Sequence, residues 1–112
     1  MIGTMVTLDA PEVAKLLAAV DVDWVFLDAE HGPLDARTLQ AMLQAAGRSM
    51  PCLVRVSHPA EVPIKQALDI GAAGIIVPQV NGAAQVQQIV QWDKYAPRAV
   101  AAHVSRGHIA MV

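Results

Sequence analysis

Short apolar runs alternate with segments of helical periodicity four times along the chain. The apolar runs are residues 3–8, 24–27, 52–56 and 74–77. They form continuous apolar stretches rather than a strict apolar–polar alternation, which is typical of strands covered on both faces or arranged around a barrel. We therefore predict four buried strands.

Each predicted strand is followed by the repeat of one helix face. The first repeat consists of Val13, Leu16, Leu17 and Val20, and the second of Leu39, Met42, Leu43 and Ala46. Asp9 and Glu12 suit a capping arrangement at the start of the first helix. Gly47 suits the end of the second helix.

The third helix is expected over about residues 60–70, with Pro63 in its first turn, where proline costs least, and Gly71 at its end. The fourth is expected to have Asn81 as its cap and to run to about Trp92. Successive strand–helix units with short connections predict parallel strands and right-handed crossovers, hence an α/β fold.

Two parallel architectures fit this pattern. The chain has 112 residues, enough for one domain, and 54% of them are hydrophobic. A doubly wound sheet can close with four or five strands at this length, whereas a full eight-stranded barrel typically needs about 250 residues. Four units equal half of such a barrel, which would leave two unpaired sheet edges and an apolar inner face.

Composition narrows the functional classes. The net charge is −2 without a basic run, so nucleic-acid binding is not expected. We also expect no membrane contact, since no apolar stretch approaches the length of a span and no basic, apolar leader is present at the N-terminus. The single cysteine, Cys52, lies in an apolar run and predicts a buried thiol and a cytoplasmic protein.

Two carboxylates and an imidazole follow the second predicted strand. Asp28, Glu30 and His31 lie just past its end, and Gly32 and Pro33 then turn the chain away. Parallel α/β folds place their chemistry at this end of the strands, and a carboxylate can support a histidine base. The same residues also suit a turn or a helix cap with a solvated histidine, so their spacing leaves both interpretations open.

Arg55 interrupts the third apolar run near its end. A buried guanidinium needs a partner, and its fork of donors suits a carboxylate ligand or an enolate oxygen. A structural ion pair with Asp28 or Glu30 is the alternative. If both strands end at one rim, all four polar residues lie together.

Other polar positions carry weaker signals. Residues 71–74, Gly-Ala-Ala-Gly, precede a strand instead of following one, so they do not fit a phosphate-binding loop. Pro78 and Gln79 follow the fourth strand at a rim position that could contact a ligand, although a plain turn is the simpler interpretation. The remaining histidines, which lack ligand-like spacing and are expected to be solvated loop residues, are His58, His103 and His108.

Several segments together resemble the HpcH/HpaI aldolase family. They are GTMVTLDAPEVAKLLA, VDWVFLDAEHGPLD, LVRVSHPAEVPIKQALDIGAAGIIVPQV and KYAPR. The resemblance covers about residues 2–98. The combination of the DxEHGP loop, the strand arginine and the LDxGAxGIIVPxV segment is specific, whereas each alone is weak.

The resemblance implies the N-terminal half of a TIM (β/α)8 barrel. It also implies a metal-dependent aldehyde-lyase that cleaves 4-hydroxy-2-oxo acids to pyruvate and an aldehyde, with magnesium, manganese or cobalt as cofactor. His31 would act in acid–base transfer, oriented by Asp28, while Arg55 would stabilise the enolate oxygen. Glu30 would lie near the water shell of the metal.

The resemblance also implies what this chain lacks. The family's first-shell metal ligands lie on later strands, so we expect no such ligand here and little activity of the chain alone. Residues 1–98 are assigned to the half-barrel and residues 99–112 to a divergent tail.

Two alternatives remain. One is a non-catalytic half-barrel that self-associates, and we expect a homo-oligomer. The other is a flavodoxin-like receiver domain, but Asp9 stands alone after the first strand and Arg55 replaces the aspartate that a receiver needs after its third.

Overall fold

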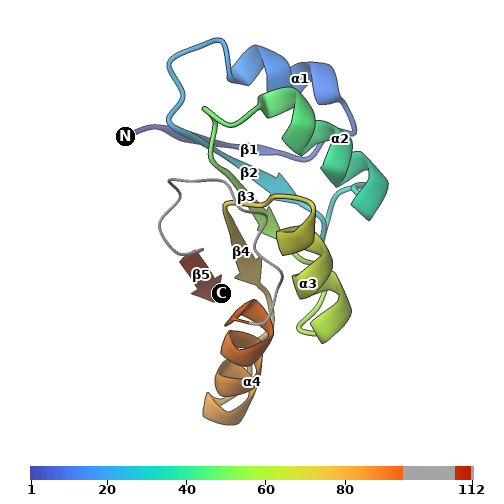
Figure 1. Cartoon of the computed structure of the whole chain (residues 1–112), viewed down its shortest axis with the longest axis vertical. Helices are drawn as coiled ribbons and strands as arrows, with labels where there is room; N and C mark the ends of the chain where they lie inside the picture. The colour runs from blue at the N-terminus through green and yellow to red at the C-terminus, as the bar shows by residue number, and fades with distance from the viewer. Residues whose placement is uncertain (95–107, 112) are drawn as a thin grey trace.

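The computed structural model describes residues 1–94 and the backbone of residues 108–111. Strands and helices alternate along the chain (Figure 1). The strands are β1 (Gly3–Val6), β2 (Trp24–Asp28), β3 (Cys52–Arg55), β4 (Gly74–Val77) and β5 (His108–Met111). The helices are α1 (Pro11–Leu17), α2 (Ala36–Ala46), α3 (Glu61–Asp69) and α4 (Ala83–Lys94).

The strands form one parallel sheet in the order β1-β2-β3-β4-β5. A doubly wound fold would reverse direction at a switch point, and this order does not. Sequential parallel strands joined by right-handed crossovers keep all helices on one side of the sheet. Figure 1 shows α1, α2 and α3 along that side. The prediction of four parallel βα units of a barrel is confirmed, and β5 is a strand that the sequence analysis did not predict.

The core lies between the helices and one face of the sheet. Val25, Leu27, Val54 and Ile75 are fully buried there, packed with helix residues such as Met42. The opposite face is covered less. On that face Phe26, Leu53 and Ile76 are half-buried, and Met5 is 56% exposed. The apolar inner face expected of a half-barrel is therefore present.

The helix ends agree with the sequence only in part. Gly47 ends α2 with a positive φ of 74°, and Gly71 follows α3 with a φ of 106°, as glycine permits. Asp9 does not cap α1: Ala10 takes that position without a side-chain hydrogen bond. Asn81 does not begin α4 either, since Gly82 directly precedes the helix and accepts the backbone N–H of Val86.

The predicted apolar face of α1 was too long. The helix ends at Leu17, so Val20 lies beyond it and is 56% exposed, while Leu16 is 67% exposed. Ala14 is buried in their place. Across the described helices, the longest of which has 12 residues, none is long and apolar enough to cross a membrane.

Candidate active site

Asp28 and Arg55 end neighbouring strands at the same edge of the sheet. Asp28 is the last residue of β2, Arg55 is the last residue of β3, and the two are register partners. Since side chains of register partners in parallel strands point to the same face, the carboxylate and the guanidinium meet on the face that the helices leave open. The expectation that these strands end at one rim is confirmed.

Arg55 binds Asp28 through a two-point contact. Its Nε donates to Oδ1 at 2.9 Å and its Nη2 donates to Oδ2 at 2.6 Å, with Asp28 only 1% exposed. The side-chain hydrogen bond from Arg55 lowers the pKa of Asp28 and outweighs desolvation, while the same bond raises the pKa of Arg55. Both groups are therefore charged at neutral pH, and the structural ion pair considered above exists.

Asp28 also shapes the loop that follows β2. Its Oδ1 accepts the backbone N–H of Glu30 at 3.0 Å and that of His31 at 3.3 Å. Gly32 completes the turn, because a Cβ at this position would lie 2.5 Å from the carbonyl oxygen of Asp28. One carboxylate thus fixes both the neighbouring guanidinium and the backbone that carries the imidazole.

Glu30 connects the ends of three strands. Its Oε2 lies 3.2 Å from Nε of Arg55 and 3.6 Å from Nε2 of His31, and its Oε1 accepts Nε2 of Gln79 at 3.4 Å. The guanidinium carbon of Arg55 lies 5.5 Å from the centre of the Phe26 ring, which adds a cation–π contact. Two carboxylates and one guanidinium leave one negative charge unbalanced at this rim.

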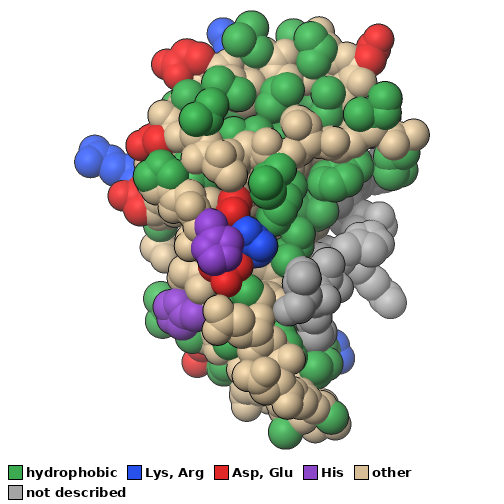
Figure 2. All heavy atoms as spheres, turned by 180° about the vertical axis from the view of Figure 1, so that it is seen from behind, with side chains coloured by type: hydrophobic (Ala, Val, Ile, Leu, Met, Phe, Trp, Pro, Cys, Tyr) green, Lys and Arg blue, Asp and Glu red, His purple; other side chains and the backbone are tan. Residues whose placement is uncertain are grey.

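His31 presents its ring to solvent. Its side chain is 70% exposed, and the carboxylate that contacts the ring belongs to Glu30, while Asp28 holds the backbone. Figure 2 shows a histidine grouped with basic and acidic side chains, with apolar side chains next to them. An exposed imidazole beside a fixed carboxylate can accept and return a proton.

Except for Gln79, the other singled-out residues lie apart from this cluster or outside the described part. His58 is exposed, and its Nδ1 lies 2.9 Å from the Ser57 hydroxyl. His103 falls outside the described residues, and only the backbone of His108 is described. Gln79 is the contact that the sequence analysis treated as a turn. In the structure, Gln79 is distinguished by its positive φ of +54°. No pattern in the sequence predicts that angle, so the sequence analysis could not single out this contact.

The described residues do not fit a first coordination shell. Among them, no group of three or more His, Cys, Asp or Glu side chains is placed to hold a metal ion. Both oxygens of Asp28 accept hydrogen bonds from Arg55, so they are not free to coordinate. The Glu30 carboxylate is more accessible to a cation than that of Asp28, because its Oε1 accepts only one long hydrogen bond, from the Gln79 amide.

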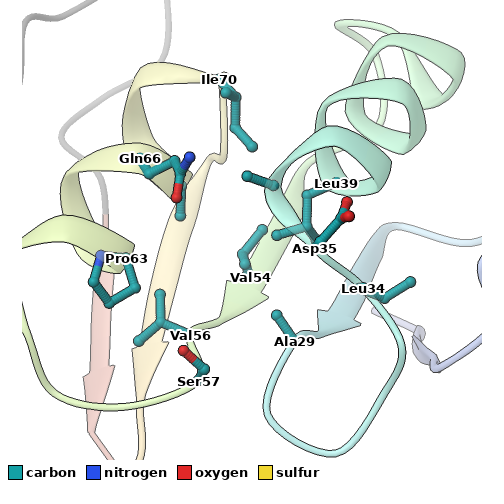
Figure 3. Close-up of a pocket in the computed structure, with 12 residues that line it drawn as sticks. Ala29, Leu34, Asp35, Leu39, Val54, Val56, Ser57, Pro63, Gln66 and Ile70 are labelled. Atoms are coloured by element: carbon teal, nitrogen blue, oxygen red, sulfur yellow. The ribbon is translucent and has the colours of Figure 1, made fainter.

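A separate pocket lies on the helix side, between α2 and α3 (Figure 3). Its walls are mostly apolar, with Val54 and Ile70 among them, and Asp35, Ser57 and Gln66 add polar groups. Neither Asp28 nor Arg55 lines it. The pocket is therefore distinct from the polar rim.

Parallel strands in sequential order, helices on one side and charged groups at the carboxyl ends define part of a (β/α)8-barrel enzyme scaffold. The model of the HpcH/HpaI aldolase/citrate lyase family matches residues 2–112. The chain belongs to this family.

Relatives and solved structures agree with that assignment. The chain is 38% identical over 98 residues to a 4-hydroxy-2-oxovalerate aldolase of Novosphingobium aromaticivorans, covering 86% of this chain and 37% of the relative. It is 40% identical over 100 residues to a hydroxypyruvate/pyruvate aldolase of Pseudomonas aeruginosa, covering 88% and 37%. The chain thus spans just over a third of the length of these curated relatives.

Among solved structures, an HpcH/HpaI aldolase/citrate lyase family protein from Burkholderia cenocepacia J2315 matches with a TM-score of 0.84. The match covers 99% of this chain and 53% of that chain at 23% identity, and it shows the shared fold. The citrate synthase SbnG matches with a TM-score of 0.78 at 32% identity, covering 88% and 41%.

Proposed function

We propose that this chain carries the acid–base half of an aldolase site that cleaves 4-hydroxy-2-oxo acids to pyruvate and an aldehyde. The observation behind the proposal is the exposed ring of His31 beside a carboxylate and guanidinium unit fixed at the carboxyl rim. The names of the aldolase relatives support the substrate class.

The residues suit the steps of this cleavage. A base accepts the proton of the C4 hydroxyl, the C3–C4 bond breaks, and the aldehyde leaves with its new carbonyl. The electron pair of that bond forms the enolate of pyruvate, which then takes a proton at C3. We assign both proton transfers to His31, which Asp28 orients through the backbone of the loop.

Arg55 opposes the negative charge that develops on the enolate oxygen. Its Nε–H and one N–H of Nη2 are bound to Asp28, whereas Nη1 makes no hydrogen bond with any described residue. We therefore assign the contact with substrate to Nη1, which has both of its N–H groups available. The Asp28 pair holds the guanidinium in place before substrate arrives, which lowers the cost of ordering it during the reaction.

We further propose that the divalent cation, magnesium, manganese or cobalt, is held by groups beyond the described residues, with Glu30 near its water shell. The unbalanced negative charge at the rim favours a cation nearby. When bound, such a cation supplies Lewis-acid polarisation of the 2-oxo acid. We also propose a cytoplasmic location, where the buried free thiol of Cys52 stays reduced.

A coupled pyruvate-release assay with each metal tests the proposal. We expect little turnover from the 112-residue chain alone, and robust metal-dependent turnover would contradict that expectation. Residues 2–98 fused to the C-terminal remainder of the Pseudomonas aeruginosa relative should release pyruvate. Replacing His31 with alanine should abolish this release, whereas His58→Ala, at another exposed rim histidine, should keep it. Equal activity of the two variants would refute the role of His31.

A second candidate is a half-barrel that pairs with a copy of itself, and the open sheet supports it. β1 is an edge strand. Met5 within it is 56% exposed, and Ile2 directly before it is 64% exposed. Light scattering at micromolar concentration should then give a dimer that Met5→Lys dissociates. A folded monomer would exclude this function.

A further inference from the structure

Gln79 holds an unfavourable backbone conformation at the rim. It lies two residues past the end of β4, and its φ is +54°. Among the described residues it is the only non-glycine with a positive φ. A left-handed conformation costs free energy for a side chain with a Cβ, so its retention at a functional rim calls for a compensating contact.

That contact reaches across the sheet. Nε2 of Gln79 donates to Oε1 of Glu30 at 3.4 Å, although 49 positions separate them in sequence and β3 lies between their strands. The other oxygen of Glu30 faces Arg55 and His31. Glu30, Arg55 and Gln79, which lie at or just past the ends of β2, β3 and β4, therefore form one connected group, called the clamp below.

We propose that Gln79 is a positioning residue that holds the Glu30 carboxylate against Arg55 and His31. Its catalytic importance rests on the proposed function, but the clamp itself does not. An amide suits the task because it donates a hydrogen bond without a charge, and so leaves the net negative charge of the rim intact. Methionine has a similar length and cannot donate.

The Nε–H resonance of Arg55 in NMR spectra of the 112-residue chain reports on the clamp, since Nε faces both Asp28 and Glu30. Gln79→Met should shift this resonance and speed its exchange with water about fivefold, the factor that one net hydrogen bond contributes. Gln79→Gly should have the same effect on the resonance, although glycine also relieves the strained φ. Comparing the two variants therefore distinguishes the effect of the side-chain amide from that of the backbone strain.

Gln88→Met is the matched control. Gln88 also donates an amide hydrogen bond of 3.4 Å, but to Gln91 on α4, away from the rim. The control should leave the Arg55 resonance unchanged. An unmoved resonance in Gln79→Met, or an equal response in the control, would overturn the proposal. No substrate is present in this experiment, so its result is independent of the pyruvate-release assay of the fused barrel. A fused barrel that releases no pyruvate would count against the proposed aldolase activity and not against the proposed role of Gln79.

Discussion

Arg55 holds Asp28 by two hydrogen bonds, from Nε to Oδ1 at 2.9 Å and from Nη2 to Oδ2 at 2.6 Å. The fork geometry follows from the parallel register, which sets the two residues side by side at the ends of β2 and β3. The pair joins the ends of β2 and β3 and leaves both N–H groups of Nη1 for other partners. Structure and proposed chemistry therefore depend on the same contact.

Removing Arg55 should leave a buried charge without its partner. We expect Arg55→Met to lower the free energy of unfolding by about 3 kcal/mol, since Asp28 is almost fully buried. Lys65→Met, which breaks the exposed pair with Glu61 on α3, should cost less than about 1 kcal/mol. Urea unfolding measures both changes, and equal losses would show that the Asp28 pair acts like a surface pair.

Acid should weaken the fold through Asp28. Its pKa in the folded chain lies below the ordinary 3.8, chiefly because Arg55 donates to it, so the unfolded chain takes up this proton first as pH falls. The stabilisation is complete above about pH 4 and is lost as pH falls through the lowered pKa.

The difference in unfolding free energy between the natural chain and Asp28→Asn should accordingly narrow below about pH 4. Urea titrations over a series of acidic and neutral buffers measure this difference. A gap of constant size at every pH would refute the linkage.

The positions of the four predicted strands could be derived from the sequence because their apolar runs are bounded by polar and glycine-containing turns. The start of α3 was predicted to within one residue, but the starts of α1 and α4 were not. Asp9 and Asn81 carry side chains that favour caps, but the helices begin one or more residues later, behind Ala10 and Gly82. Capping residues are also common in turns, so composition alone does not fix the boundary. β5 was missed because it lies within residues 99–112, which the sequence analysis assigned to a divergent tail without a predicted strand.

The residues of the candidate site were also predictable only in part. Asp28 and Arg55 were predictable because Asp28 follows one buried run, Arg55 interrupts the next run near its end, and the carboxyl ends of parallel strands meet at one rim. The contact between Glu30 and Gln79 was not, since it joins residues that lie 49 positions apart and involves one unusual φ. Likewise, the sequence could not show that Asp28 holds the backbone of His31 while Glu30 faces its ring.

Cys52 should be inert to thiol reagents in the folded chain. Burial raises the pKa of its thiol to about 11, and its Sγ donates to the carbonyl of Met50 at 3.4 Å. Relative to the ordinary 9.0, the thiolate fraction is about 100-fold lower near pH 8. A disulfide reagent should label the protein only after denaturation. Ser49→Cys, at an exposed position nearby, should add one thiol that reacts at once. Rapid labelling of the natural protein would contradict the burial.

Gly32 should tolerate no side chain. A Cβ there would lie 2.5 Å from the carbonyl oxygen of Asp28 and 3.3 Å from that of Thr7, and both are backbone atoms that cannot turn aside. We expect Gly32→Ala to cost about 1–3 kcal/mol, the range for overpacked sites, and to pull the backbone N–H of His31 away from Asp28.

Gly82→Ala is the control for this prediction, because a Cβ there meets nothing within 4 Å. Gly82 directly precedes α4, a position where alanine is less favourable than glycine, so this variant should lose no more than about 1 kcal/mol. Hydrogen exchange of the His31 amide separates a local from a global effect: it should speed up in Gly32→Ala and stay unchanged in Gly82→Ala. Normal protection of that amide in Gly32→Ala would mean that the loop does not need glycine to hold His31 at the rim.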